Sequence, residues 1–198
     1  MQNQLVKEQT FQWLESVVIG LNLCPFARRE LDAAKIVVEV SGAKSDEQLL
    51  TSLQAEFERL QRCPEIETIL LVHPHSQVDF QQYNLFLGIA DDLLTSLGLE
   101  GFFQIASFHP DYQFAGTEAH DAENYSNRSP YPMLHLLREE SVERAIARYP
   151  DVHAIPDRNI ALLKAVGVAK LDTLLKACFL QKDDSGKSAR VKNKDKSQ

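Results

Sequence analysis

The sequence predicts a single α/β domain over residues 1–180, with a three-stranded parallel sheet, crossover helices, an N-terminal helix and a C-terminal helical segment. Short runs of β-branched and aromatic residues at 36–40, 68–72 and 102–108 predict the strands. Two stretches of helical periodicity separate these runs, and right-handed crossovers make such strands parallel. An antiparallel α+β arrangement also fits, because the connecting helices are long enough for either topology.

A helix with one apolar face is expected at the start of the chain. Apolar residues recur at helical spacing over 5–21, and the pattern ends near Gly20. Pro25 then favours the first turn of a second, short helix with Cys24 as its cap, since proline is well tolerated at that position. Two consecutive helices are therefore predicted before the first strand.

Both crossover helices carry start signals in the sequence. Ser45 with Gln48, and Asp79 with Gln82, follow the capping-box pattern, in which the first side chain accepts a bond from a nearby backbone N–H. Gly98 is the expected end of the second helix, because glycine readily adopts the conformation that terminates a helix. These signals predict the boundaries of the helices between the strands.

The second half of the chain is predicted to be a long loop followed by helices. Residues 109–132 form the loop, and loops of that length inside a domain are commonly functional. Helices are expected at 133–149, 157–166 and 168–179. The tail 181–198 holds six Lys or Arg, three Asp and almost no apolar residues, which predicts a disordered basic appendage.

Composition is typical of an intracellular globular protein. The 198 residues carry a formal net charge of -7, which does not favour broad binding to nucleic acid or anionic membranes. No apolar run reaches the length of about 18 residues that a membrane helix requires, and the N-terminus lacks the apolar run of a signal peptide. Three scattered cysteines fit a reducing compartment. We expect a cytoplasmic protein without a membrane partner.

Histidines follow two of the predicted strands at the point where each strand ends. His73 comes directly after the second strand, and His109 with Asp111 comes after the third. Ligands of open α/β sheets bind beyond the carboxyl ends of parallel strands, so these side chains are expected at one edge. His109 is a candidate acid–base group, with Asp111 as its orienting partner.

Further polar groups lie in the long loop and in the helix expected after it. Arg128 stands at the centre of a proline-rich turn, where its guanidinium suits a carboxylate or a phosphate. His135, Arg138 and Glu139 have the spacing i, i+3 and i+4, so a helix would place them on one face. The candidate substrate-binding residues are Arg128, Arg138, Tyr112 and Asn127.

Three kinds of chemistry fit these residues, and the sequence alone leaves them open. A metal site would use His73, His109, Asp111 and His135, although no metal-binding helix motif is present. A thiol site would use Cys24, whose pKa a helix N-terminus lowers, with a histidine such as His109 as base. Acid–base catalysis needs neither a metal nor a thiol. The candidate catalytic residues are Cys24, His109, Asp111 and His135, with no metal assigned.

Four segments of the chain are especially distinctive: GLNLCPFA at 20–27, QIASFHPDYQF at 104–114, NRSPYPMLHLLREES at 127–141 and IPDRNI at 155–160. Together they resemble a bacterial family known as domain of unknown function 1415, over roughly residues 5–178. The resemblance implies no particular reaction or cofactor. It includes the candidates Cys24, His109, Asp111, Arg128, His135 and Arg138, and it leaves out His73.

We therefore expect a small cytoplasmic enzyme that acts on an anionic small molecule by His/Asp acid–base or Cys thiol chemistry, with Arg128 and Arg138 holding the anion. The alternative is a non-catalytic binding or assembly protein that docks a partner through 109–139. Nucleic-acid binding through the basic tail is not favoured, because the rest of the chain is strongly acidic. Cofactor, substrate and oligomeric state are not predicted.

Overall fold

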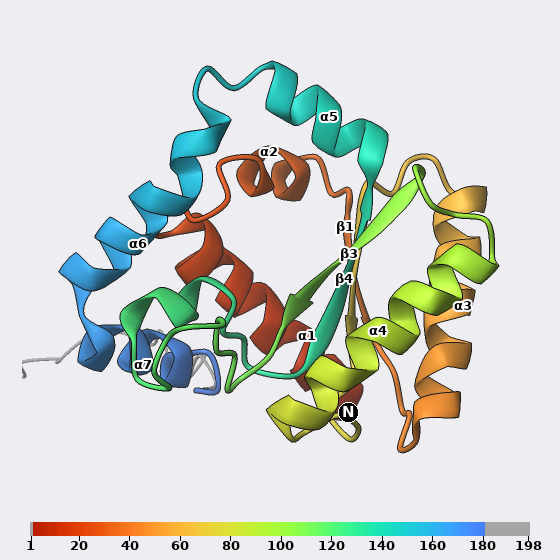
Figure 1. Cartoon of the computed structure of the whole chain (residues 1–198), viewed down its shortest axis with the longest axis horizontal. Coiled ribbons are helices and arrows are strands. Elements are labelled where there is room, and N and C mark those ends of the chain that lie inside the picture. Colours follow the sequence, from red (N-terminus) through yellow and green to blue (C-terminus); the bar gives the residue numbers. More distant parts are fainter. Residues whose placement is uncertain (1, 181–198) are drawn as a thin grey trace, which may run out of the picture.

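The computed structural model describes residues 2–180, which contain a four-stranded sheet with helices on both faces (Figure 1). The predicted mixture of helices and strands is confirmed, and each of the three predicted strands is present. The tail 181–198, expected to be a disordered appendage, lies outside the described residues. The strands are β1 (Ile36–Val40), β2 (Thr68–Val72), β3 (Phe103–Phe108) and β4 (Met133–Arg138).

The sheet is mixed and has the strand order β1-β2-β4-β3. β1 and β2 pair in parallel, whereas β4 lies between β2 and β3 and runs antiparallel to both. The prediction of a three-stranded parallel sheet is therefore wrong in its detail. β2 and β3 point the same way, as predicted, but a strand that the sequence did not reveal separates them.

Residues 133–138 form β4 where the sequence favoured a helix over 133–149. Leu134 and Leu136 are fully buried on one face of the sheet, and Met133 is fully buried on the other. A central strand covered on both faces has an almost continuous apolar sequence, so the alternation that marks a strand disappears. The helix begins only afterwards, as α5 (Glu139–Ala147).

Helices α3 (Asp46–Arg62) and α4 (Phe80–Ser96) cover one face of the sheet (Figure 1). Both predicted caps are confirmed, because the side chains of Ser45 and Asp79 each accept a bond from the backbone three residues later. The core on this face joins the two helices to β2, β3 and β4. Its fully buried members include Leu49, Leu53, Phe57, Ile69, Leu134 and Leu136.

The opposite face carries α1 (Gln2–Trp13), which continues as a π-helix, η1 (Leu14–Ile19), and then α2 (Ala27–Asp32). The predicted N-terminal helix is confirmed. The second helix begins at Ala27 rather than at Pro25, so Pro25 lies in the preceding turn. The core on this side contains Trp13, Val17, Val38, Leu70, Val72 and Met133.

The C-terminal helices α6 (Ile155–Val166) and α7 (Val168–Ala177) are joined at Gly167, as the sequence predicts. Gly167 has a φ of 80°, a conformation that glycine adopts without strain. α6 packs against η2 (Ala122–Ser126), a 3-10 turn inside the long loop. This contact gives the loop a fixed structure on the same face as α1.

Tyr83 of α4 fixes the point where β3 and β4 stop pairing. Its side chain is fully buried, and its hydroxyl donates to the Met133 carbonyl oxygen at 2.8 Å. The same hydroxyl accepts a bond from the Phe108 amide at 3.0 Å. Burial raises the pKa of Tyr83, so the hydroxyl stays protonated and can serve as donor and acceptor at once.

We predict that Tyr83→Phe lowers the free energy of unfolding by about 1–3 kcal/mol, because it leaves the partly buried Phe108 N–H and the buried Met133 carbonyl oxygen without their partner. Urea denaturation measures the change. Tyr112→Phe is the matched control, since the Tyr112 hydroxyl accepts one long bond, at 3.4 Å from Ser107. Equal stability of the two variants would show that the Tyr83 hydroxyl does not hold the strand ends.

Candidate functional site

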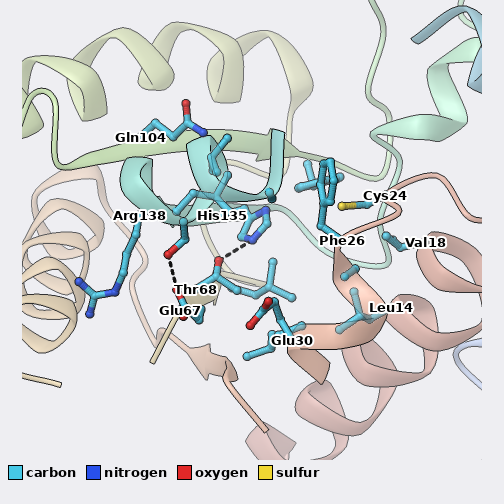
Figure 2. Close-up of a pocket in the computed structure, with 18 of the residues that line it drawn as sticks. Leu14, Val18, Cys24, Phe26, Glu30, Glu67, Thr68, Gln104, His135 and Arg138 are labelled. Carbon is cyan, nitrogen blue, oxygen red and sulfur yellow. Dashed lines mark hydrogen bonds between the residues drawn. The ribbon is translucent and has the colours of Figure 1, made fainter. Parts of the chain in front are cut away.

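A cavity of about 310 Å³ lies between the sheet and the helices α1, η1, α2 and α5 (Figure 2). This volume suits a small organic molecule. Side chains on one face of the sheet form its floor: Ile36, Thr68, Leu70, Gln104, Phe108, His135 and Leu137. The helices and the turn before α2 add Trp13, Leu14, Val18, Cys24, Phe26, Ala27, Glu30, Ser141, Val142 and Ala145, and Glu67 and Arg138 complete the lining.

The turn that brings Cys24 to the cavity is held from the C-terminal half of the chain. The Arg158 guanidinium donates to the Asn22 carbonyl oxygen at 2.7 Å. The Asn159 amide donates to the Leu23 carbonyl oxygen at 2.8 Å. The segments GLNLCPFA and IPDRNI, which are far apart in the sequence, therefore meet beside the cavity.

His135 of β4 lies at the centre of the cavity floor (Figure 2). Its Nε2 is 2.6 Å from the Thr68 hydroxyl oxygen. That hydroxyl donates its single proton to the Leu136 carbonyl oxygen at 2.6 Å, so it can only accept from His135. Nε2 therefore carries the ring proton, and Nδ1 presents a lone pair toward the cavity.

Burial also fixes the charge of His135. Loss of hydration disfavours the imidazolium and lowers the pKa of His135 to about 4. At neutral pH the ring is therefore uncharged and acts as a hydrogen-bond acceptor at Nδ1. An acceptor placed in an apolar cavity is poorly solvated, so a ligand that donates a hydrogen bond to it gains more than it would in water.

Cys24 lines the same cavity, but its thiol is not activated. Burial raises the pKa of the Cys24 thiol and outweighs the backbone N–H groups of Phe26 and Ala27, which favour the thiolate. The lowered pKa expected from the sequence is therefore wrong. The expected base, His109, does not line the cavity, whereas His135 does.

Two carboxylates, Glu30 of α2 and Glu67 before β2, also line the cavity. Glu67 accepts bonds from Ser141 and from Lys35, the latter at 3.1 Å. Although burial alone raises the pKa of Glu67, these partners lower it overall. Glu30 is held less firmly, because its ion pair at 3.5 Å is with the adjacent Arg29, whose side chain is 68% exposed.

His109 lies at the carboxyl end of β3, as predicted, but both of its ring nitrogens are bonded to backbone groups. Its Nδ1 accepts a bond from the Asp111 amide at 3.0 Å, and its Nε2 donates to the Gln77 carbonyl oxygen at 3.1 Å. Burial lowers the pKa of His109, so this neutral state is favoured. The side chain of Asp111 is exposed and does not orient the ring, contrary to the predicted pair.

The candidate substrate-binding residues of the long loop, Tyr112, Asn127 and Arg128, are bonded to the loop itself or to β3. Arg128 donates to the carbonyl oxygens of Tyr112 and Ala119 and lies over the Tyr125 ring. The Asn127 amide donates to the Ser107 carbonyl oxygen at 3.1 Å. These groups fold the 109–132 segment, and the loop and the cavity are separate features.

Arg138 lies at the end of β4, where its guanidinium turns away from His135 (Figure 2). It donates to the carbonyl oxygens of Leu60, Cys63 and Ile66, at and after the C-terminus of α3. The predicted helical face of His135, Arg138 and Glu139 is wrong, because the first two belong to a strand and point to opposite faces. Arg138 therefore caps a helix and is not free to clamp an anion.

Of the histidines considered as metal ligands, His73 and His109 both lie against the Tyr83 ring, whereas His135 does not. His73 is fully buried, donates from Nδ1 to the Ser76 carbonyl oxygen and stacks on Tyr83. His135 lies in the cavity instead. Within residues 2–180, no three His, Cys, Asp or Glu side chains are close enough together to hold a metal ion.

Sequence reasoning placed Cys24 and His135 among the candidates, and the structure brings both to one cavity. It missed Thr68, Glu30 and Gln104. Thr68 gave a usable signal, because it is the polar residue of the aliphatic run TILLV. Glu30 and Gln104 gave none, since an acidic residue on a short helix and a glutamine in an edge strand are ordinary surface residues.

Residues 5–173 match the family described as Protein of unknown function (DUF1415), and the chain belongs to this family. No curated protein and no solved structure matches the chain. None of the helices within residues 2–180 is long and apolar enough to cross a membrane.

We predict that His135 makes the stability of the protein depend on pH. The pKa of His135 in the folded protein, about 4, lies below the ordinary value of 6.5. The contribution of the neutral ring to the free energy of unfolding is therefore complete above pH 6.5 and is lost as the pH falls toward 4. Between pH 7 and pH 5, this titration lowers the free energy of unfolding by about 2 kcal/mol. His135→Leu should abolish that part of the pH dependence. Urea denaturation at both pH values measures it, and an unchanged pH dependence would contradict the assignment.

We predict that Arg138→Gln lowers the free energy of unfolding by about 1–3 kcal/mol, because the carbonyl oxygens at the end of α3 lose their charged donor. Arg148→Gln, which changes an exposed arginine at the end of α5, is the control and should change stability little. Urea denaturation compares the two. If Arg138→Gln left stability unchanged, the capping role would be wrong.

Proposed function

We propose that this member of the DUF1415 family binds a small, mainly apolar molecule in the cavity, and that His135 Nδ1 accepts a hydrogen bond or a proton from it. The observation that supports this proposal is the hydrogen bond between Thr68 and His135, which commits Nε2 as a donor and leaves the Nδ1 lone pair toward an apolar space. Mainly apolar pockets with a few placed polar groups are typical of ligand sites.

Proton transfer is the enzymatic chemistry that this cavity supports best. A substrate proton would pass to Nδ1, while the Thr68 oxygen keeps its bond to Nε2–H in both charge states of the ring. Because burial lowers the pKa of His135 to about 4, the imidazolium would hold the proton only briefly and return it within the same reaction. Thiol chemistry is less favoured, since burial raises the pKa of Cys24.

The alternative of a partner surface on the 109–139 segment has less support. The polar side chains that suggested it, above all Arg128 and Asn127, are bonded to backbone within the same segment or to β3. A partner would have to displace these bonds before it could use the groups. The cavity requires no such rearrangement, because its acceptor nitrogen already faces the open space.

The single tryptophan of the chain, Trp13, lines the cavity, so its fluorescence reports binding directly. We predict that 2-phenylethanol changes this fluorescence and that Val142→Phe, which fills the cavity from α5, weakens binding at least about tenfold. Ile146→Phe is the matched control on the same helix, because Ile146 is 41% exposed and lies outside the cavity.

His135→Leu separates the hydrogen bond from the apolar contribution to binding. It should weaken 2-phenylethanol binding by about 2- to 13-fold and leave the binding of ethylbenzene, which has no donor, nearly unchanged. Binding that resists Val142→Phe would place the ligand elsewhere and refute the proposed site. Equal effects of His135→Leu on both compounds would refute the role of Nδ1.

A further inference from the structure

We propose that the cavity is selective for hydrophobic amines: an aromatic or aliphatic body against the apolar walls, and a protonated amino group held by Glu30 and His135. This inference rests on the proposed function and specifies its ligand class. It departs from the anionic substrate that the sequence suggested. The reason is the kind of polar group that the cavity presents.

The polar groups that remain free to meet a ligand are mainly acceptors. His135 presents a lone pair at Nδ1, and Glu30 and Glu67 present carboxylate oxygens, whereas the Gln104 amide offers both an acceptor and donors. The hydroxyl protons of Thr68 and Ser141 are already donated, to the Leu136 carbonyl oxygen and to Glu67. An ammonium group has three donors and no acceptor, so it complements this set.

The charged groups around the cavity also favour a cationic ligand over an anionic one. The guanidinium of Arg138 is bonded to three carbonyl oxygens at α3 and turns away from the cavity. Lys35 and Arg144 both lie against Glu67, at 3.1 Å and 3.7 Å. Among the described residues, the cation paired with Glu30 is Arg29, whose side chain is 68% exposed, so a carboxylate ligand would meet Glu30 with little positive charge to balance it. Such a meeting is unfavourable in a cavity of low polarity.

Glu30 is the carboxylate best placed to change partners. Its ion pair with Arg29 joins neighbouring residues and involves a largely exposed guanidinium, so a ligand cation can replace it at little cost. Glu30 belongs to α2, and His135 faces α2 from the sheet (Figure 2). Both residues line the same cavity, so an ammonium ligand can meet the Glu30 carboxylate and the His135 acceptor from one space, and the neutral ring of His135 does not repel it.

The aromatic side chains that line the cavity suit the body of such a molecule. Phe108 packs edge-on against Trp13, with ring centroids 5.2 Å apart, and both rings line the cavity with Phe26. Aromatic walls attract cations as well as apolar groups, so they tolerate an ammonium at the edge of the cavity. A hydrophobic amine therefore satisfies both the walls and the acceptors.

Three compounds of matched size test the inference: 2-phenylethylamine, which is protonated at pH 7, 2-phenylethanol and phenylacetate. Calorimetric titration of the full-length protein should show the amine binding about tenfold or more tightly than the alcohol, since charge-assisted hydrogen bonds are the stronger ones. Phenylacetate should bind most weakly. Glu30→Gln should reduce the preference for the amine to about twofold or less and leave alcohol binding nearly unchanged.

Glu143→Gln is the matched control, because Glu143 is an exposed carboxylate on α5 that does not line the cavity, and it should preserve the preference. Equal binding of amine and alcohol, or tighter binding of phenylacetate, overturns the inference. If the alcohol still binds and Val142→Phe still blocks it, the proposed function stands although the ligand class is wrong. If none of the three compounds binds, the proposed function fails as well.

Discussion

The insertion of β4 between β2 and β3 is the constraint on which the rest of the structure depends. The antiparallel register places His135 opposite Leu70 on one side and Ala106 on the other. Ala106 is small, so the sheet surface beside the imidazole is open, and Thr68 is close enough to bond to its Nε2. A shift of one residue would turn His135 toward α3 and α4 and remove the acceptor from the cavity.

The same register explains why Arg138 is structural although it lies three residues from His135. Side chains alternate along a strand, so His135 and Arg138 emerge on opposite faces. Arg138 then reaches the carbonyl oxygens that the C-terminus of α3 leaves without helical partners. One short strand therefore supplies a cavity residue on one face and a helix cap on the other.

Local signals in the sequence predicted much of the fold, and contacts between distant segments account for what was missed. The caps at Ser45 and Asp79 depend on bonds across three residues, so the sequence contains them in full. The pairing of β4 with two strands does not appear in its own apolar sequence. Since three strand runs were recognised without the fourth, the parallel sheet was the natural but incorrect interpretation.

The candidate site likewise depends on contacts between distant segments that local sequence signals do not reveal. A dense run of polar residues at 109–139 suggested a binding surface. A long loop whose regular structure is limited to the short η2 turn must, however, bond its buried backbone groups to other partners. His109, Arg128 and Asn127 do this. The cavity is instead built from residues that look unremarkable alone, such as Glu30 and Gln104. Many polar side chains in a loop are thus weak evidence for a binding site, unless other groups already bond the buried backbone N–H and carbonyl groups of that loop.

The helices α2 and α5, which cover the cavity on the side away from the sheet, are held by fewer buried contacts than the rest of the fold. Neither α2 nor α5 contains a fully buried residue, unlike α3 and α4 on the other face. Phe26, just before α2, meets Tyr149, just after α5, in an edge-on contact with ring centroids 5.6 Å apart. Segments with few buried contacts open at low free-energy cost, whereas the sheet beneath them does not. The floor is the firmer half of the cavity, because Thr68 belongs to a buried strand and orients His135 whether or not the cavity is filled.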